Sequence, residues 1–156
     1  MRKAHVLLLV TLSLLAAPAL AEEIIHPESG LKFVLPRGWT YSQDGDALIA
    51  TNLNGTVSMI FLVTDIDSSA DLLDAISQEL GDSIQDAQLT NQPVSQQSHG
   101  LTLVHAEGIG ICGGEACDWD LTLVTGGRKN LFMVAIGDIA TNESAIHRVY
   151  DSIRSQ

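Results

Sequence analysis

Aromatic and basic residues are both scarce in this chain of 156 residues. Only seven side chains are Phe, Trp or Tyr, so isoleucine, leucine and valine must supply most of a hydrophobic core. Eight lysines and arginines stand against nineteen aspartates and glutamates, a formal net charge of −11. A field of this sign repels phosphate groups and anionic headgroups. The composition therefore argues against binding of nucleic acid.

The sequence also lacks the patterns of common enzyme sites. It contains no Gly-x-Ser-x-Gly elbow and no phosphate-binding loop. Its later histidines, His26, His99, His105 and His147, show no spacing typical of a zinc-ligand pair. We expect His105 to be half-buried and hydrogen-bonded in a strand, and His147 to be exposed on a helix. The sequence thus predicts no catalytic residue, no metal site and no cofactor.

The first 21 residues have the features of a secretory signal peptide. Arg2 and Lys3 precede an apolar stretch at 6–17, which is shorter than the ~20 residues of a membrane span. Ala19-Leu20-Ala21 then places small residues where a signal peptidase reads them. We expect cleavage after Ala21, which leaves six basic and nineteen acidic residues, a net charge of −13.

The remaining residues, 22–156, are expected to form a single exported domain. Its length is typical of one domain with its own core. No cysteine follows the expected cleavage site directly, so we expect no lipid anchor and no stable membrane attachment. The protein is therefore expected in the periplasm or outside the cell.

Cys112 and Cys117 are the only cysteines and flank a four-residue turn. In an oxidising compartment such a pair is typical of a disulfide that closes a hairpin tip. A redox-active pair usually has two intervening residues at a helix N-terminus, and this pair has four with no helix signal after it. We interpret it as a structural disulfide.

Hydrophobic periodicity predicts an α+β fold with a largely antiparallel sheet of about six to eight strands and two main helices. One helix should follow capping residues at Ser68 or Ser69 and end at Gly81, and another should be capped by Thr141 or Asn142. Asn54-Gly55 predicts a hairpin turn. The expected strands are 24–26, 31–35, 40–43, 47–52, 57–63, a weak edge strand within 87–96 that contains Pro93, 101–111, 119–125 and 131–136.

The segment Gly30-Leu31-Lys32-Phe33-Val34-Leu35-Pro36-Arg37-Gly38-Trp39 resembles the opening of the PsbP-like superfamily, the extrinsic photosystem II protein and its bacterial relatives. The order of elements that follows is also similar. The resemblance implies an antiparallel sheet sandwiched between helices. It also implies a non-catalytic binding or assembly role beside a larger partner.

Acidic residues gather around the cysteine hairpin. Asp118 and Asp120 lie two apart on a predicted strand and so share a face, which we expect to be the solvent face. Together with Glu115 they could bind a hard cation such as calcium. A solvated acidic surface explains the same residues. The calcium-loop-like segment that starts at Asp65 has Ala70 where glycine is required.

Three functions remain open at this point. The first is an exported, non-catalytic module that binds a protein partner, whose identity the sequence does not give. The second is a cation-binding domain that uses the hairpin carboxylates. The third is an enzyme whose site is assembled from residues far apart in the sequence.

Overall fold

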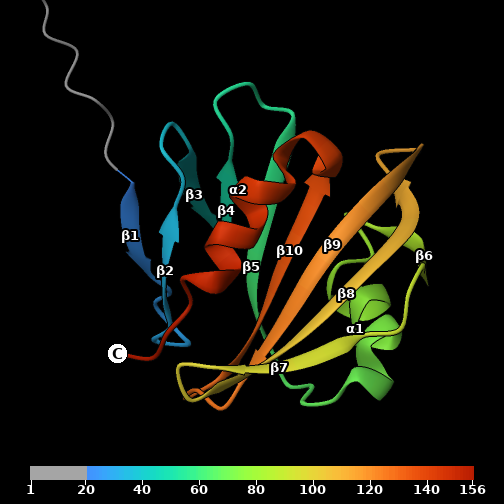
Figure 1. The fold of residues 1–156 in the computed structure, drawn as a ribbon. Coiled ribbons are helices and arrows are strands. Elements are labelled where there is room, and N and C mark those ends of the chain that lie inside the picture. Colours follow the sequence, from blue (N-terminus) through green and yellow to red (C-terminus); the bar gives the residue numbers. More distant parts are fainter. Residues whose placement is uncertain (1–20) are drawn as a thin grey trace, which may run out of the picture.

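The computed structural model describes residues 21–156, so the predicted signal peptide lies outside the described residues except for Ala21. Ten strands and two α-helices make up this part of the chain (Figure 1). The elements are β1 (Glu22–Ile25), β2 (Lys32–Leu35), β3 (Thr40–Asp44), β4 (Ala47–Thr51), β5 (Val57–Thr64), α1 (Leu72–Glu79), β6 (Gln85–Leu89), β7 (Val94–Ser98), β8 (Leu101–Cys112), β9 (Glu115–Thr125), β10 (Asn130–Gly137) and α2 (Ile139–Asp151).

Eight of the strands form one antiparallel sheet in the order β3-β4-β5-β10-β9-β8-β6, with β7 also paired to β8. The long hairpin of β8 and β9 dominates its right half in Figure 1, and its register pairs Glu107 with Asp120 and His105 with Thr122. β1 and β2 form a separate two-stranded ladder. The predicted α+β class is confirmed.

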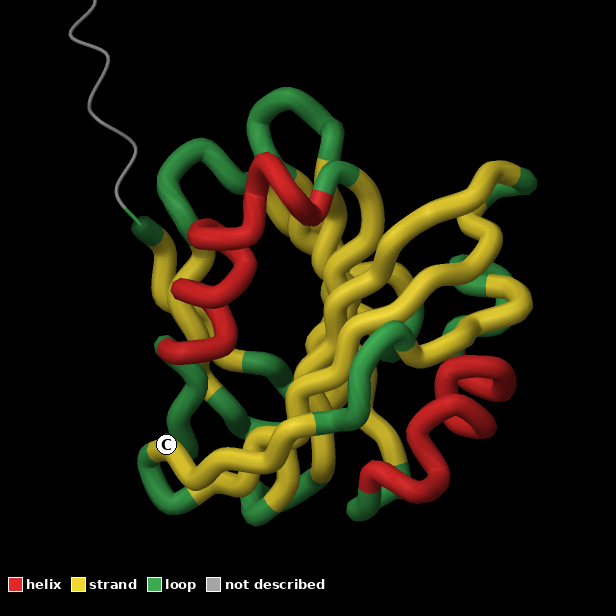
Figure 2. The backbone as a smooth tube through the Cα atoms, turned by 45° about the vertical axis from the view of Figure 1, so that its right-hand side comes forward, coloured by secondary structure: helices red, strands yellow, loops and turns green. Residues whose placement is uncertain are grey.

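The two helices lie on opposite faces of the sheet (Figure 2). α2 and the β1-β2 ladder cover one face, where Phe33 and Phe61 stack with ring centroids 4.2 Å apart. α1 covers the other face, where Leu72 and Ile76 pack in the same cluster as Trp119. β10 and the second half of β9 are therefore buried on both faces, which explains the nearly continuous apolar sequence of β10. The predicted sandwich of helices around a sheet is confirmed.

Three sequence expectations need correction. The second helix begins after Asp138, whose side chain accepts a hydrogen bond from the Thr141 amide, so neither Thr141 nor Asn142 is the cap. The weak strand expected within 87–96 is two strands, β6 and β7, because Pro93 lies between them. The face of β9 that carries Asp120 is not a solvent face, since α2 lies over it and leaves Asp120 only 2% exposed.

Cys112 and Cys117 form the disulfide expected from the sequence, with Cα atoms 5.7 Å apart. They close the β8-β9 hairpin at its tip, where Gly113 and Gly114 both adopt positive φ. Within residues 21–156, no helix has the length and apolar character needed to span a membrane.

Candidate metal site

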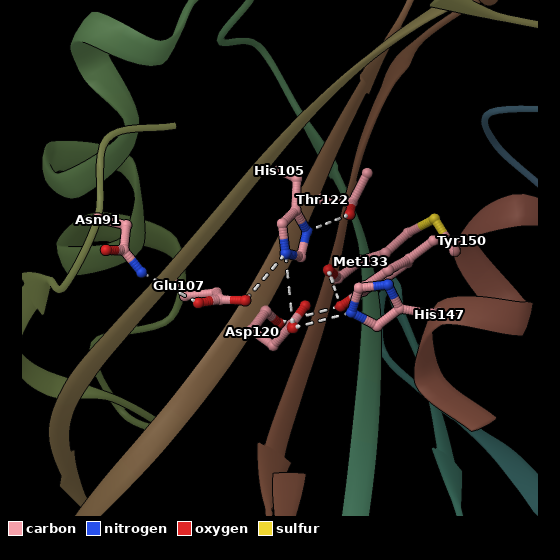
Figure 3. A network of polar contacts seen from close by, with 8 residues as sticks. All are labelled: Asn91, His105, Glu107, Asp120, Thr122, Met133, His147 and Tyr150. Carbon is pink, nitrogen blue, oxygen red and sulfur yellow. Dashed lines mark hydrogen bonds and ion pairs between the residues drawn. The ribbon is translucent and has the colours of Figure 1, made fainter. Parts of the chain in front are cut away.

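Two histidines and an aspartate converge between the sheet and α2. His105 comes from β8, Asp120 from the neighbouring strand β9, and His147 from α2 (Figure 3). One ligand atom of each side chain lies within 4.8 Å of the others. The fold thus brings together three side chains of metal-binding types that are far apart in the sequence.

The Asp120 carboxylate lies between the two imidazoles. Its Oδ2 is 3.7 Å from His105 Nε2 and 3.8 Å from His147 Nε2. The His105 and His147 rings meet edge to face, with centroids 5.4 Å apart. A tetrahedral zinc site with bonds of about 2.0–2.1 Å separates its ligand atoms by about 3.3 Å. Each imidazole nitrogen would need to approach Asp120 Oδ2 by about 0.5 Å, and the two nitrogens, which lie within 4.8 Å, would need to approach each other by up to about 1.5 Å.

The two imidazole nitrogens that face Asp120 Oδ2 lack a hydrogen-bond partner. His105 Nε2 and His147 Nε2 are buried and make no hydrogen bond, and neither does the other Asp120 oxygen, Oδ1. Buried polar atoms without partners are rare, and a site for a bound ion is one of the standard explanations. This observation separates the cluster from an ordinary hydrogen-bonded structural histidine.

Surrounding groups orient these side chains. His105 Nδ1 lies 3.3 Å from Thr122 Oγ1, its cross-strand neighbour, so a proton on Nδ1 can be donated to that hydroxyl and leave Nε2 free to bind a metal. The Tyr150 hydroxyl contacts the main-chain carbonyls of Asp120 and Met133 at 3.1 and 3.3 Å. These contacts hold α2, and with it His147, against β9.

Burial controls the charge of this cluster. Desolvation raises the pKa of Asp120, while the charges of His105 and His147 and a hydrogen bond with Tyr150 act in the opposite direction. Burial also raises the pKa of Tyr150 well above its usual value, so its hydroxyl stays protonated and available as a donor. A cation bound between the imidazoles would remove the cost of keeping Asp120 ionised.

Glu107 stands beside the cluster as a fourth oxygen donor. Its Oε1 is 3.5 Å from His105 Nε2, and its Oε2 accepts a hydrogen bond from Asn91 Nδ2 at 3.3 Å. With a side chain 47% exposed, it is less constrained than Asp120, which is 3% exposed. Glu107 or a water molecule could complete a four-coordinate site.

The carboxylates proposed from the sequence do not stay together. Asp118 and Asp120 line one pocket of about 220 Å³, together with Glu107 and Glu143. Glu115 lies at the hairpin tip, opposite Cys112, and is not among the lining residues of that pocket.

The sequence did not predict the histidines as metal ligands, because that role depends on how α2 packs against β9. His105 itself is half-buried and contacts Thr122, as its strand parity indicated.

No family model and no curated protein matches the chain. Its fold is nevertheless similar to that of cyanobacterial PsbP from Synechocystis, with a TM-score of 0.63, 15% identity, and coverage of 90% of this chain and 95% of that one. The fold is PsbP-like. The resemblance inferred from the Gly-Trp opening is thereby confirmed at the level of the fold.

Two further structures share the PsbP-like fold. A protein of Bacteroides thetaiotaomicron gives a TM-score of 0.54 at 15% identity, and the match covers 87% of this chain but only 48% of that one. LpqN of Mycobacterium tuberculosis, described as involved in cell envelope biogenesis, gives 0.51 at 14% identity, over 86% of this chain and 90% of that one.

Proposed function

We propose that this protein is an exported, non-catalytic binding module whose ligand is a divalent transition-metal ion. One observation carries the proposal: His105 and His147 each direct a buried Nε2 atom without a hydrogen-bond partner toward the Asp120 carboxylate, and the three ligand atoms lie within 4.8 Å of one another. Two imidazoles and a carboxylate suit zinc, copper or nickel better than calcium, which prefers six to eight oxygen ligands. The hairpin-based calcium site expected from the sequence is therefore the weaker candidate.

Export is supported by the signal-like first 21 residues and by the Cys112–Cys117 disulfide. One of the fold neighbours, LpqN, is described as involved in cell envelope biogenesis, which supports a role in the exported compartment. A protein partner, the first expectation from the sequence, is compatible with this proposal, because binding of a metal between β9 and α2 does not exclude a protein interface elsewhere on the molecule.

Calorimetric titration of the metal-free protein with zinc, and cobalt spectroscopy of the same sample, test the proposal. We expect one site per chain and a tetrahedral cobalt spectrum, both lost in His147→Ala and Asp120→Asn. His99→Asn is the matched control, since His99 is an exposed loop histidine whose positive φ asparagine tolerates. Equal zinc binding by the wild type and His147→Ala would overturn the proposal.

A further inference from the structure

A second binding feature adjoins the metal cluster. Four carboxylates from three elements line the 220 Å³ pocket: Glu107 from β8, Asp118 and Asp120 from β9, and Glu143 from α2. No lysine or arginine of residues 21–156 lines it. Its walls also include Ile139 and Ala140 at the start of α2, whereas the Trp119 indole is buried on the opposite, α1 face of the sheet.

The fold imposes this convergence of like charges. Glu107 and Asp120 are direct cross-strand partners, and like charges in such a pair repel. Asp118 lies two residues before Asp120 on the same face of β9. Glu143 precedes His147 by one helical turn, so α2 presents both residues toward β9. Within residues 21–156, Asp118 and Glu143 have no ion-pair partner, although the N-terminal end of α2 offsets part of the repulsion.

One of the four groups is an unsatisfied buried acid. The Asp120 side chain is 3% exposed, and its Oδ1 has no hydrogen-bond partner, although Oδ2 faces the imidazoles. An ordinary solvated acidic surface would leave every carboxylate oxygen in water. Here a lining residue retains an unused acceptor, which distinguishes the pocket from such a surface.

We propose that this pocket binds an organic cation, an ammonium or guanidinium group carried on an apolar stem. The carboxylates would receive the charge and its N–H donors, while Ile139 and Ala140 would contact the stem. The volume is below the ~300–1,000 Å³ of typical drug-sized pockets, so it suits the end of a side chain or a small amine. The strong negative charge of the chain would steer such a ligand toward it.

Titration of the metal-free protein with agmatine in EDTA, followed by amide NMR shifts, tests the proposal. We expect saturable shifts at Gly108, Trp119 and Glu143, and at least a tenfold loss of affinity in Asp118→Asn/Glu143→Gln. Asp44→Asn/Asp46→Asn is the matched control, because it removes the same charge from the exposed β3-β4 hairpin. Butylurea, a neutral analogue, should not bind.

The proposal is overturned if agmatine produces no saturable shifts at millimolar concentration, or if both double variants weaken it equally. An Ala-Arg-Ala peptide that binds more tightly than agmatine would indicate a basic protein as the source of the cation, and the reverse order a free amine. Zinc binding should stay within threefold of wild type in Asp118→Asn/Glu143→Gln, because neither residue belongs to the histidine cluster. Zinc binding therefore tests the metal site, and agmatine binding tests the amine pocket, so either proposal can fail without the other.

Discussion

Tyr150 lies on the buried face of α2, and its hydroxyl donates a hydrogen bond to the main-chain carbonyl of Asp120 at 3.1 Å. This hydrogen bond connects the helix that carries His147 to the strand that carries Asp120. The same contact therefore stabilises the fold and positions two of the candidate metal ligands. Both consequences can be measured.

Tyr150→Phe should lower the free energy of unfolding by about 1–3 kcal/mol, because two buried carbonyls lose the hydroxyl donor that lies near both. Zinc affinity should fall as well, since α2 loses the contact that positions His147. Urea denaturation and zinc calorimetry give the two values. Tyr41→Phe is the control: Tyr41 is 45% exposed and should tolerate the change. A Tyr150→Phe protein with unchanged stability would contradict this account.

Zinc should raise the melting temperature of the wild-type protein. A ligand that binds only the folded state stabilises it by about 2.7 kcal/mol at a free concentration of 100 Kd. The effect should vanish in His105→Ala and remain in His99→Asn. Calcium at the same concentrations should have little effect, because imidazole is a poor ligand for it. Equal shifts with calcium and zinc would instead favour binding by carboxylates alone.

The His26 side chain should make the protein less stable in mild acid. It is fully buried, and its Nδ1 accepts a hydrogen bond from the Ser29 amide at 3.3 Å. Burial lowers the pKa of His26, an effect opposed in part by the Phe61 backbone and the Glu28 charge. Folding therefore favours the neutral form, and the stability this provides is present above the unfolded pKa of about 6.5 and is lost as the pH falls below it.

His26→Asn keeps an acceptor near the Ser29 amide but does not titrate. Its unfolding free energy should fall less than that of wild type between pH 7.5 and 5.5, as measured by urea denaturation. Asp120 acts in the opposite direction, because its raised pKa favours the folded state as the pH falls. The test is therefore the difference in unfolding free energy between wild type and His26→Asn as a function of pH. If that difference does not change with pH, His26 does not have this role.

Gly108→Ala should be strongly destabilising, by at least about 2–3 kcal/mol. Gly108 pairs with Trp119 across β8 and β9, and an added Cβ would overlap the indole ring and the Gln88 carbonyl oxygen. Gly127→Ala is a useful comparison, because there the nearest atom is the end of the flexible Leu31 side chain at 3.0 Å. Thermal denaturation should separate the two variants clearly, and equal melting temperatures would argue against the overlap.

The sequence predicts most of the sheet because strand parity is a local property. The alternation in 31–35 and the apolar run in 57–63 identify β2 and β5 without knowledge of their partners. Pro93 correctly indicated a position outside the centre of the sheet, but it lies between two short strands, β6 and β7, and not within a single edge strand.

The candidate site could not be predicted in the same way. Parity shows that Asp118 and Asp120 share a face, yet not that α2 covers that face. The helical period places Ile146, Val149 and Tyr150 toward the core, and His147 at the border of that stripe. Which strand His147 then meets depends on the packing of the helix across the sheet, a long-range property that no local spacing encodes.

The oxidation state of Cys112 and Cys117 in a given molecule depends on the compartment that the molecule has reached. A chain still in a reducing cytosol would carry two free thiols, whereas an exported chain would carry none. Thiol labelling under denaturing conditions, read as a gel shift in cell fractions, would therefore report the compartment of the protein directly and independently of any ligand.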